Sequence, residues 1–326
     1  MGNLERRSDM VHIFTHNDLD GYAAGYVILQ TFGKENCEIT HLNYENEPAL
    51  EKVKLGDTVY ITDYSFTNDQ FRQLLNLVGD DGHVIWCDHH ITAINRYQNE
   101  DDLYLEGIRS TKYCGAVLIW CYFNDFDTED IETMPYEQLC EYLPRYLRVV
   151  DAWDTWKLNS IYRKDAEALN TAVASRLSDD TFENVVNNLQ KHIDTGKQYI
   201  DFRNQWSKQF RDKYMFEKIL PGELFGTNRK VTAAILNIGC ANSTYFGDAI
   251  EKYDVCVTMC FNGTFWNVSV YSNRDDINCG LYCELHGGGG HKGAAGCTFE
   301  QITPPAFILN DDEEIIVKEK KKNGKI

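Results

Sequence analysis

The sequence predicts an α/β fold with an N-terminal parallel-sheet domain, a helical linker and a smaller α+β domain. Up to about residue 160, short apolar runs alternate with stretches of helical spacing, which is typical of βαβ units. Residues 179–218 then form a long polar stretch with helical spacing, no Pro and a single Gly. From residue 230 the pattern changes to strands with turn residues between them. A chain of 326 residues is long enough for two domains.

Four strands are expected in the first domain, each a short apolar or alternating run bounded by polar or turn residues. They cover residues 11–15, 37–44, 58–62 and 84–87. The helices expected between and after them begin near Tyr22 and cover 48–53 (weakly), 68–78 and 115–123. Another helix is expected over residues 136–150, because its apolar side chains fall on one stripe.

The second domain is expected to be rich in strands. Residues 231–237 and 255–261 have strand character, and Asn262-Gly263 is a two-residue hairpin signal that returns the chain through 264–271. A short helix over 279–285 leads into a Gly-rich segment. The expected divisions of the chain are a first domain 1–160, a helical linker 161–220, a second domain 221–309 and a charged, mobile tail 310–326.

The composition restricts the function. The formal net charge of −18 argues against tight binding of long nucleic acid, which depends on clustered Lys and Arg. The eleven Cys are scattered and odd in number, and no run approaches the length of a membrane span or a secretory signal. We therefore expect free thiols and a cytoplasmic protein that does not bind membranes.

Acids and histidines follow three of the expected strands directly. The first strand ends in His16, Asp18 and Asp20, the third in Asp63, and the fourth in Asp88, His89 and His90. Because the carboxyl ends of parallel strands meet at one edge of a sheet, these side chains are expected to lie together. Asp151, which follows an apolar helix and lies beside Trp153, is a further candidate, although it could equally be a turn or capping residue.

Mixed imidazole and carboxylate ligands suit divalent transition metals, and the number of carboxylates favours Mn²⁺ or Mg²⁺ over a structural zinc. Each motif alone is weak, since a polar loop that caps the next helix would have a similar sequence. Their agreement in one predicted sheet geometry is what favours a metal site.

The Gly-rich segment of the second domain has a physical role of its own. Successive glycines at 287–290 let the backbone approach a phosphate and present amide groups to it, and His291 and Lys292 add donors. The alternative is a flexible loop. A zinc site made by Cys279, Cys283, His286 and His291 fits no common spacing. Trp153 and Trp156 are either core residues or a base-stacking platform.

In their order along the chain, these motifs resemble those of the DHH phosphoesterase superfamily, in particular its DHHA1 subgroup and the nanoRNase-type oligoribonucleases within it. The matching segments are Thr15-His16-Asn17-Asp18-Leu19-Asp20-Gly21, Thr62-Asp63, Asp88-His89-His90, Val150-Asp151 and Gly287-Gly288-Gly289-Gly290-His291. The resemblance covers about residues 11–156 and 231–300.

The resemblance implies two Mn²⁺-type ions, with Mg²⁺ or Co²⁺ as alternatives. One ion would be held by His16, Asp18 and Asp63, and the other by Asp20, Asp63, His89 and Asp151. Asp88 would orient a histidine, and His90 would face the phosphate as a hydrogen-bond donor or acid. In the second domain, Gly288, Gly289, Gly290, His291, Lys292 and Arg274 would bind substrate. Substrate would lie between the two domains.

The function expected from the resemblance is hydrolysis of short oligonucleotides to mononucleotides. The alternatives are a phosphatase or phosphodiesterase for a cyclic dinucleotide, pAp or polyphosphate, and a nucleotide-binding module without catalysis. The partner would be a short oligonucleotide or small nucleotide, not long duplex nucleic acid, and a homodimer is compatible with the sequence.

Overall fold

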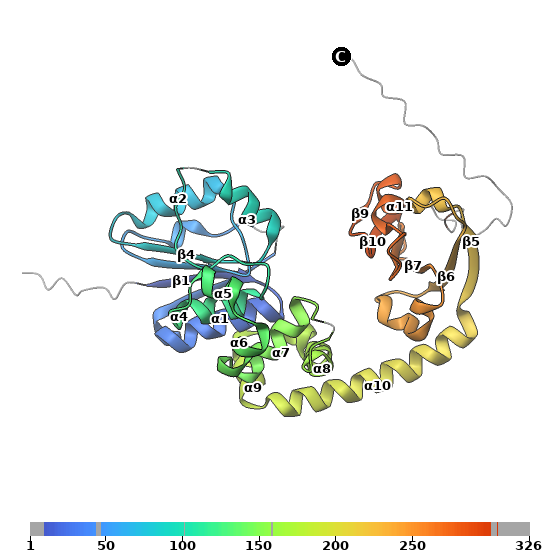
Figure 1. Cartoon of the computed structure of the whole chain (residues 1–326), viewed down its shortest axis with the longest axis horizontal. Coiled ribbons are helices and arrows are strands. Elements are labelled where there is room, and N and C mark those ends of the chain that lie inside the picture. Colours follow the sequence, from blue (N-terminus) through green and yellow to red (C-terminus); the bar gives the residue numbers. More distant parts are fainter. Residues whose placement is uncertain (1–9, 44–46, 101, 158, 301–304, 306–326) are drawn as a thin grey trace, which may run out of the picture. The chain divides into compact units, whose positions relative to one another are not determined.

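The computed structural model describes residues 10–43, 47–100, 102–157, 159–300 and Pro305 (Figure 1). The expected charged tail 310–326 lies outside the described residues. The chain divides into two compact units, Met1–Ile200 and Asp201–Ile326.

The N-terminal unit contains the predicted four-stranded parallel sheet. Its strands are β1 (Val11–His16), β2 (Cys37–Leu42), β3 (Thr58–Thr62) and β4 (His83–Cys87), in the order β2-β1-β3-β4. All three neighbouring pairs are parallel. The carboxyl ends of β1, β3 and β4 therefore lie at one edge, and this edge carries the acids and histidines of the sequence motifs.

Helices cover both faces of this sheet (Figure 1). One face packs on α1 (Leu19–Phe32) and α4 (Gly115–Phe123), and the other on α2 (Asn68–Val78) and α3 (Ile91–Gln98). Alternate strand residues supply the two cores: Ile13 and Tyr60 lie in one, Phe14 and Ile61 in the other. A sheet buried on both faces explains why its strands read as continuous apolar runs.

The helix predicted over 136–150 is two helices. These are α6 (Tyr136–Tyr142) and α7 (Arg145–Asp154), and they are separated by Leu143 and Pro144. Pro144 cannot continue a helix because it lacks the amide hydrogen and its ring clashes with the preceding turn. It instead caps α7, which extends to Asp154. Asp151 and Asp154 therefore lie in the last turn of a helix.

Two further helices belong to this unit. The short helix α5 (Thr128–Thr133) precedes α6, and α8 (Arg163–Val173) packs on the same core as α7.

The single long helix expected over 179–218 is also divided. It consists of α9 (Asp179–Asn187) and α10 (Leu189–Tyr214), and its last residues belong to a strand, β5 (Phe216–Leu220). β5 pairs antiparallel with β6 (Val231–Asn237), so tertiary pairing overrides the helical spacing of these residues. The division between the two units falls within α10, between Ile200 and Asp201.

The C-terminal unit contains a mixed six-stranded sheet, as expected for an α+β domain. After β5, its strands are β6 (Val231–Asn237), β7 (Val255–Phe261), β8 (Trp266–Tyr271), β9 (Gly289–Gly290) and β10 (Ala294–Phe299). Their order is β5-β6-β7-β8-β10-β9, and only β6 and β7 pair in parallel. Helix α11 (Cys279–Leu285) packs on the core of this sheet.

The hairpin between β7 and β8 has a longer loop than predicted. Phe261 pairs with Trp266, so four residues connect the strands rather than Asn262 and Gly263 alone. The side chain of Asn262 accepts hydrogen bonds from the amides of Thr264 and Phe265, which forms the turn.

The described helices include none that is both long and apolar enough to cross a membrane.

Candidate metal centre

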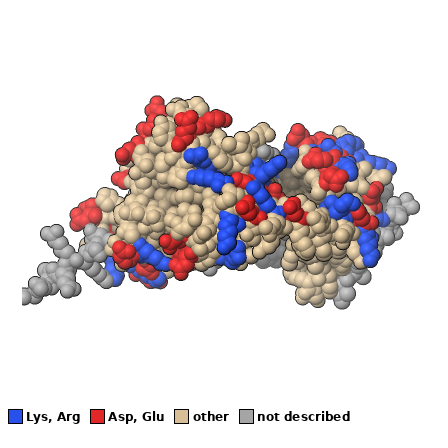
Figure 2. Space-filling view, turned by 90° about the horizontal axis from the view of Figure 1, so that it is seen from below, with Lys and Arg blue, Asp and Glu red and all other residues tan. Residues whose placement is uncertain are grey.

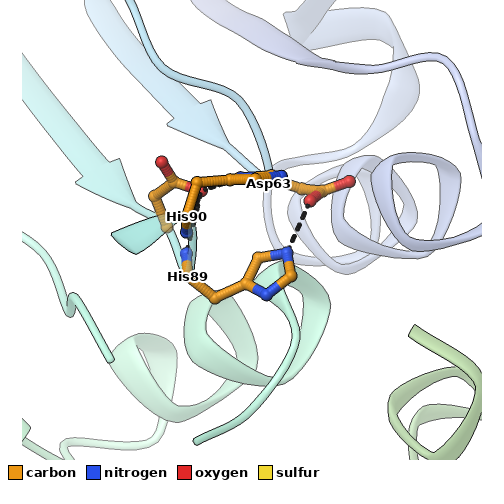
Figure 3. A group of neighbouring side chains, drawn as sticks. Asp63, His89 and His90 are labelled. Carbon is orange, nitrogen blue, oxygen red and sulfur yellow. Dashed lines mark hydrogen bonds and ion pairs between the residues drawn. The ribbon is translucent and has the colours of Figure 1, made fainter. Parts of the chain in front are cut away.

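The strand ends bring most of the predicted metal-binding side chains together. Ligand atoms of three sets lie within 4.8 Å of one another: His16, Asp18 and Asp63; Asp63, Asp88, His89 and His90; and Asp20, His89 and Asp154. Asp63 belongs to two of these sets, as does His89. Figure 3 shows the imidazole of His89 turned toward the carboxylate of Asp63.

His89 lies at the centre of the acids. Its Nε2 atom is 3.2 Å from Asp63 Oδ1, 3.3 Å from Asp154 Oδ2 and 4.0 Å from Asp20 Oδ2. One imidazole nitrogen thus faces three carboxylates, one directly after β3 and the others in α7 and α1. Such an arrangement is typical of side chains that converge on a cation.

Asp63 is held in an uncommon backbone conformation. Its φ is +51°, in the left-handed region that non-glycine residues seldom occupy. Its amide donates to the carbonyl of Cys87 over 3.1 Å, which keeps β3 and β4 paired beyond the end of β3. A Cβ on Gly115 would lie 2.6 Å from the Cβ of Asp63, so glycine is needed where α4 meets this residue. The strain is stored at the residue shared by two ligand sets.

Helix termini position the acids of the first motif. Asp18 caps α1, accepting from the amide of Gly21 over 3.0 Å and from His16 Nδ1 over 2.8 Å. Asp20 is buried and accepts from the amides of Gly115 and Ala116, over 2.7 and 2.9 Å, at the start of α4. These bonds fix the two carboxylates and leave each oxygen a further lone pair.

Asp151 does not join the metal-type sets of the described residues, and Asp154 does. The buried carboxylate of Asp151 accepts from the amide of Cys114 over 3.0 Å and is 2.5 Å from the amine of Lys157. The resemblance assigned a ligand role to Asp151, whereas Asp154, three residues later, is the acid of this turn that lies beside His89. The signal for Asp154 was present, since it follows Asp151 by three residues and shares its face of α7.

The ion pair between Asp151 and Lys157 helps to hold the backbone that positions Asp20. Asp151 holds the amide of Cys114 immediately before the two amides that hold Asp20. Lys157 also donates to Thr155 and to the carbonyl of Lys112. Its three amine hydrogens are therefore all used within the fold.

Replacing Lys157 by Met is expected to lower the free energy of unfolding by about 3 kcal/mol, because it leaves the buried Asp151 carboxylate without its partner. Urea unfolding would measure this. The matched control is Lys34→Met, which breaks the exposed pair with Asp180 and should leave stability unchanged. Equal stability of the two variants would contradict the supporting role of Lys157.

The electrostatics of the centre favour a bound cation. Burial, together with the charges of Asp20, Asp18, Asp154 and Asp88, raises the pKa of Asp63 well above its usual range. Burial and the nearby acids likewise raise the pKa of Asp154 to about 9. Among the described residues, Asp63 Oδ2, Asp88 Oδ2 and Asp154 Oδ2 are buried without a hydrogen-bond partner. Crowded, unsatisfied carboxylate oxygens fit divalent cations, which would neutralise their repulsion.

The pKa values of the two adjacent histidines shift in opposite directions. Burial and the neighbouring His90 lower the pKa of His89, which favours the neutral imidazole that binds a metal. Burial would also lower the pKa of His90, but the hydrogen bond and charge of Asp88 outweigh it and raise this pKa. Asp88 Oδ1 lies 2.8 Å from His90 Nδ1, as expected of a carboxylate that orients a histidine.

The candidate substrate-binding residues all belong to the C-terminal unit. The Gly-rich segment runs from α11 into β10, and Gly288 to Lys292 are exposed. A Cβ on Gly288 would lie 2.1 Å from the carbonyl oxygen of Gly296, whereas one on Gly289 would meet nothing within 4 Å. Arg274 is half-buried and donates to the carbonyl of Glu251 over 2.6 Å. The metal-type sets of the described residues include none of Cys279, Cys283, His286 and His291.

Comparisons with known proteins agree with these observations. No family model matches the chain. It is 24% identical to oligoribonuclease NrnB of Bacillus subtilis over 92% of its own length and 75% of that protein. Its fold is similar to that of a pGpG-specific phosphodiesterase, PggH, from Vibrio cholerae, with a TM-score of 0.51 and 13% identity, covering 89% of this chain and 93% of that one.

Three lines of observation thus agree: ordered motifs at the strand ends, a parallel sheet that brings them together, and a relative that matches along nearly the whole chain. Along most of its length the chain is thus similar to an oligoribonuclease, in agreement with the resemblance of its motifs to the DHH phosphoesterase superfamily.

Proposed function

We propose that this protein is a metal-dependent phosphodiesterase that hydrolyses short oligonucleotides to mononucleotides. The observation that carries the proposal is the convergence of two metal-type ligand sets on Asp63, within 4.8 Å. The name of the relative from Bacillus subtilis supports the substrate class. The net charge of −18 favours short substrates, and Lys and Arg are interspersed with Asp and Glu on the face shown in Figure 2.

The ligand sets allow two divalent cations. The first would be held by His16, Asp18 and Asp63, and the second by Asp20, His89 and Asp154. Asp63 of the first set lies beside His89 of the second, with 3.2 Å between Oδ1 and Nε2. Two such cations would supply a hydroxide nucleophile near neutral pH and would neutralise charge that develops on the phosphoryl oxygens. Ligands of mixed nitrogen and oxygen type favour Mn²⁺, with Mg²⁺ and Co²⁺ as alternatives.

His90 is placed to move a proton. Its side chain is 35% exposed, more than those of His89, Asp63 and Asp154, so it is the member of this group most open to substrate. Asp88 holds its Nδ1 atom and raises its pKa, which keeps the imidazolium available near neutral pH. His90 would donate this proton to the leaving oxygen of the ester.

The Gly-rich segment would bind the substrate phosphate through its backbone amides. Gly289→Ala and His291→Ala are expected to raise KM about tenfold with little change in kcat, because they alter an exposed anion-binding segment. Steady-state kinetics on a dinucleotide would measure this. Gly289→Ala should keep the wild-type melting temperature, whereas Gly288→Ala should lower it through the clash with Gly296. An unchanged KM in both Gly289→Ala and His291→Ala would contradict a role of this segment in substrate binding.

A substrate panel tests the function as a whole. The dinucleotide pApA, cyclic di-AMP, pAp and polyphosphate would each be incubated with the full-length protein and Mn²⁺. The proposal expects pApA to be hydrolysed fastest and to yield mononucleotides. Fastest hydrolysis of another member would assign that substrate, and nucleotide binding without cleavage in Mn²⁺, Mg²⁺ or Co²⁺ would indicate a binding module.

A further inference from the structure

The N-terminal unit contains a cavity that the proposed chemistry does not use. Its volume is about 820 Å³, within the usual range for small-molecule sites. It lies between α6, the face of α7 that carries Arg148, and the segment that follows α7. Its lining includes three aromatic side chains, Tyr136, Trp156 and Tyr162.

The cavity lining and the metal centre include neighbouring residues of the chain. The cavity wall includes Thr155, the residue after Asp154, so the two Cα atoms are ~3.8 Å apart. Trp156 follows with a φ of +54°, a left-handed conformation that is an outlier for a bulky residue. Strained residues of this kind persist mainly where function requires a particular orientation. Trp156 is also 63% exposed, with the guanidinium of Arg163 4.1 Å from its ring centroid.

The charged groups of the cavity favour a neutral ligand over a phosphate. All three donors of Lys157 are already used by Asp151, Thr155 and Lys112. Arg148 uses Nε and Nη1 to bond the carbonyl of Leu143 and the hydroxyl of Tyr162. Within the described residues, its Nη2 group donates no hydrogen bond and remains available.

Two carboxylates, Glu137 and Glu141, complete the lining from the exposed side of α6. With one available guanidinium against two acids, the cavity would repel a free phosphate. A flat ring that offers acceptors to Arg148 and N–H donors to a carboxylate matches it better. Aromatic walls add a stacking surface for such a ring.

We propose that this cavity is a nucleobase site that takes a purine, with guanine preferred. Guanine presents two acceptors that suit an arginine and N–H groups that suit a carboxylate. Its ring would stack on Trp156 or Tyr162. The inference rests on the proposed function, because the base would belong to the nucleotide whose phosphate lies at the metal centre.

Calorimetric titration of the full-length protein with guanosine, without added metal, tests the site apart from catalysis. Guanosine should bind the wild type with a Kd below about 1 mM, and Trp156→Asn should weaken binding at least fivefold by removing the stacking ring. Asn tolerates the left-handed backbone at this position. The control Tyr104→Asn removes another exposed aromatic side chain, outside the cavity lining, and should bind as the wild type does. Absence of binding, or equal binding in all three proteins, would overturn the proposal.

A second variant guards against misfolding of Trp156→Asn. Glu137 and Glu141 are exposed, so Glu137→Gln combined with Glu141→Gln should fold normally. Inosine lacks the exocyclic amine of guanosine. The ratio of guanosine affinity to inosine affinity should therefore fall several-fold in this double variant. An unchanged ratio would contradict the assignment of guanine. If the protein binds guanosine but hydrolyses no substrate of the panel, the proposed phosphodiesterase function is contradicted and the base site is supported. If it hydrolyses a substrate but does not bind guanosine, the base site is contradicted and the phosphodiesterase function is supported.

Discussion

Replacing Asp63 by Asn is expected to lower kcat for a short oligonucleotide by roughly a thousandfold or more, the loss that follows when a shared metal ligand is removed. Asp63 would be a ligand of the first cation, and its Oδ1 atom is 3.2 Å from Nε2 of His89, a ligand of the second, so its loss should affect both cations. Asn has nearly the same shape and tolerates the φ of +51°, so the change removes charge while keeping the backbone. Turnover with saturating Mn²⁺ would be compared with that of the wild type.

The same variant should not be less stable than the wild type in the absence of metal. A carboxyl whose folded pKa is raised favours folding in its protonated form, so its ionisation destabilises the protein as pH rises above the unfolded value. Asn removes this ionisation, and the metal-free variant should melt at or above the wild-type temperature at pH 8. Near wild-type turnover would exclude the two-cation arrangement, and a much lower melting temperature would attribute the loss of activity to the fold.

Asp154→Asn and Asp151→Asn are expected to separate the two acids of α7. Asp154→Asn should reduce activity at least about a hundredfold and weaken Mn²⁺ binding, because its carboxylate lies 3.3 Å from His89 Nε2 and has a buried oxygen without a hydrogen-bond partner. Asp151→Asn should lower the free energy of unfolding by about 3 kcal/mol through loss of the pair with Lys157. The folded Asp151→Asn protein should keep activity within about tenfold of the wild type.

Calorimetric Mn²⁺ titration and urea unfolding of both variants would measure these effects. Each variant serves as the control for the other, since both replace an acid of the same helical turn by its amide. Normal stability together with lost Mn²⁺ affinity in Asp151→Asn would return the ligand role to Asp151.

The N-terminal fold and the neighbourhood of the acids could be predicted because they follow from local patterns. β3 covers the predicted residues 58–62, and β1, β2 and β4 differ from prediction by two residues or fewer at either end. Strands buried on both faces leave an unbroken apolar signal, and parallel order places their ends at one edge. His16, Asp63 and His89 lie together for this reason.

The remaining differences concern contacts between distant segments. Asp151 pairs with Lys157 and the amide of Cys114, and Asp154 lies beside His89, because of positions in space that no spacing rule gives. β5 forms because β6 offers it a partner. The division of the predicted helix at Pro144 has a local cause that the sequence does contain. The continuous apolar stripe over residues 136–150 favoured a single helix, although Pro144 interrupts it.

The crowding of acids around His89 also makes cation uptake an exchange reaction. Burial and mutual repulsion raise the pKa of Asp63, and they raise that of Asp154 to about 9, so the Asp154 carboxyl group is expected to carry a proton at neutral pH in the metal-free protein. A cation must displace that proton, so each loading event acidifies the surrounding solution. The apparent affinity for the cation therefore increases with pH over the range in which Asp154 titrates, up to about 9. Cellular pH and metal supply would consequently act on this enzyme as one combined variable.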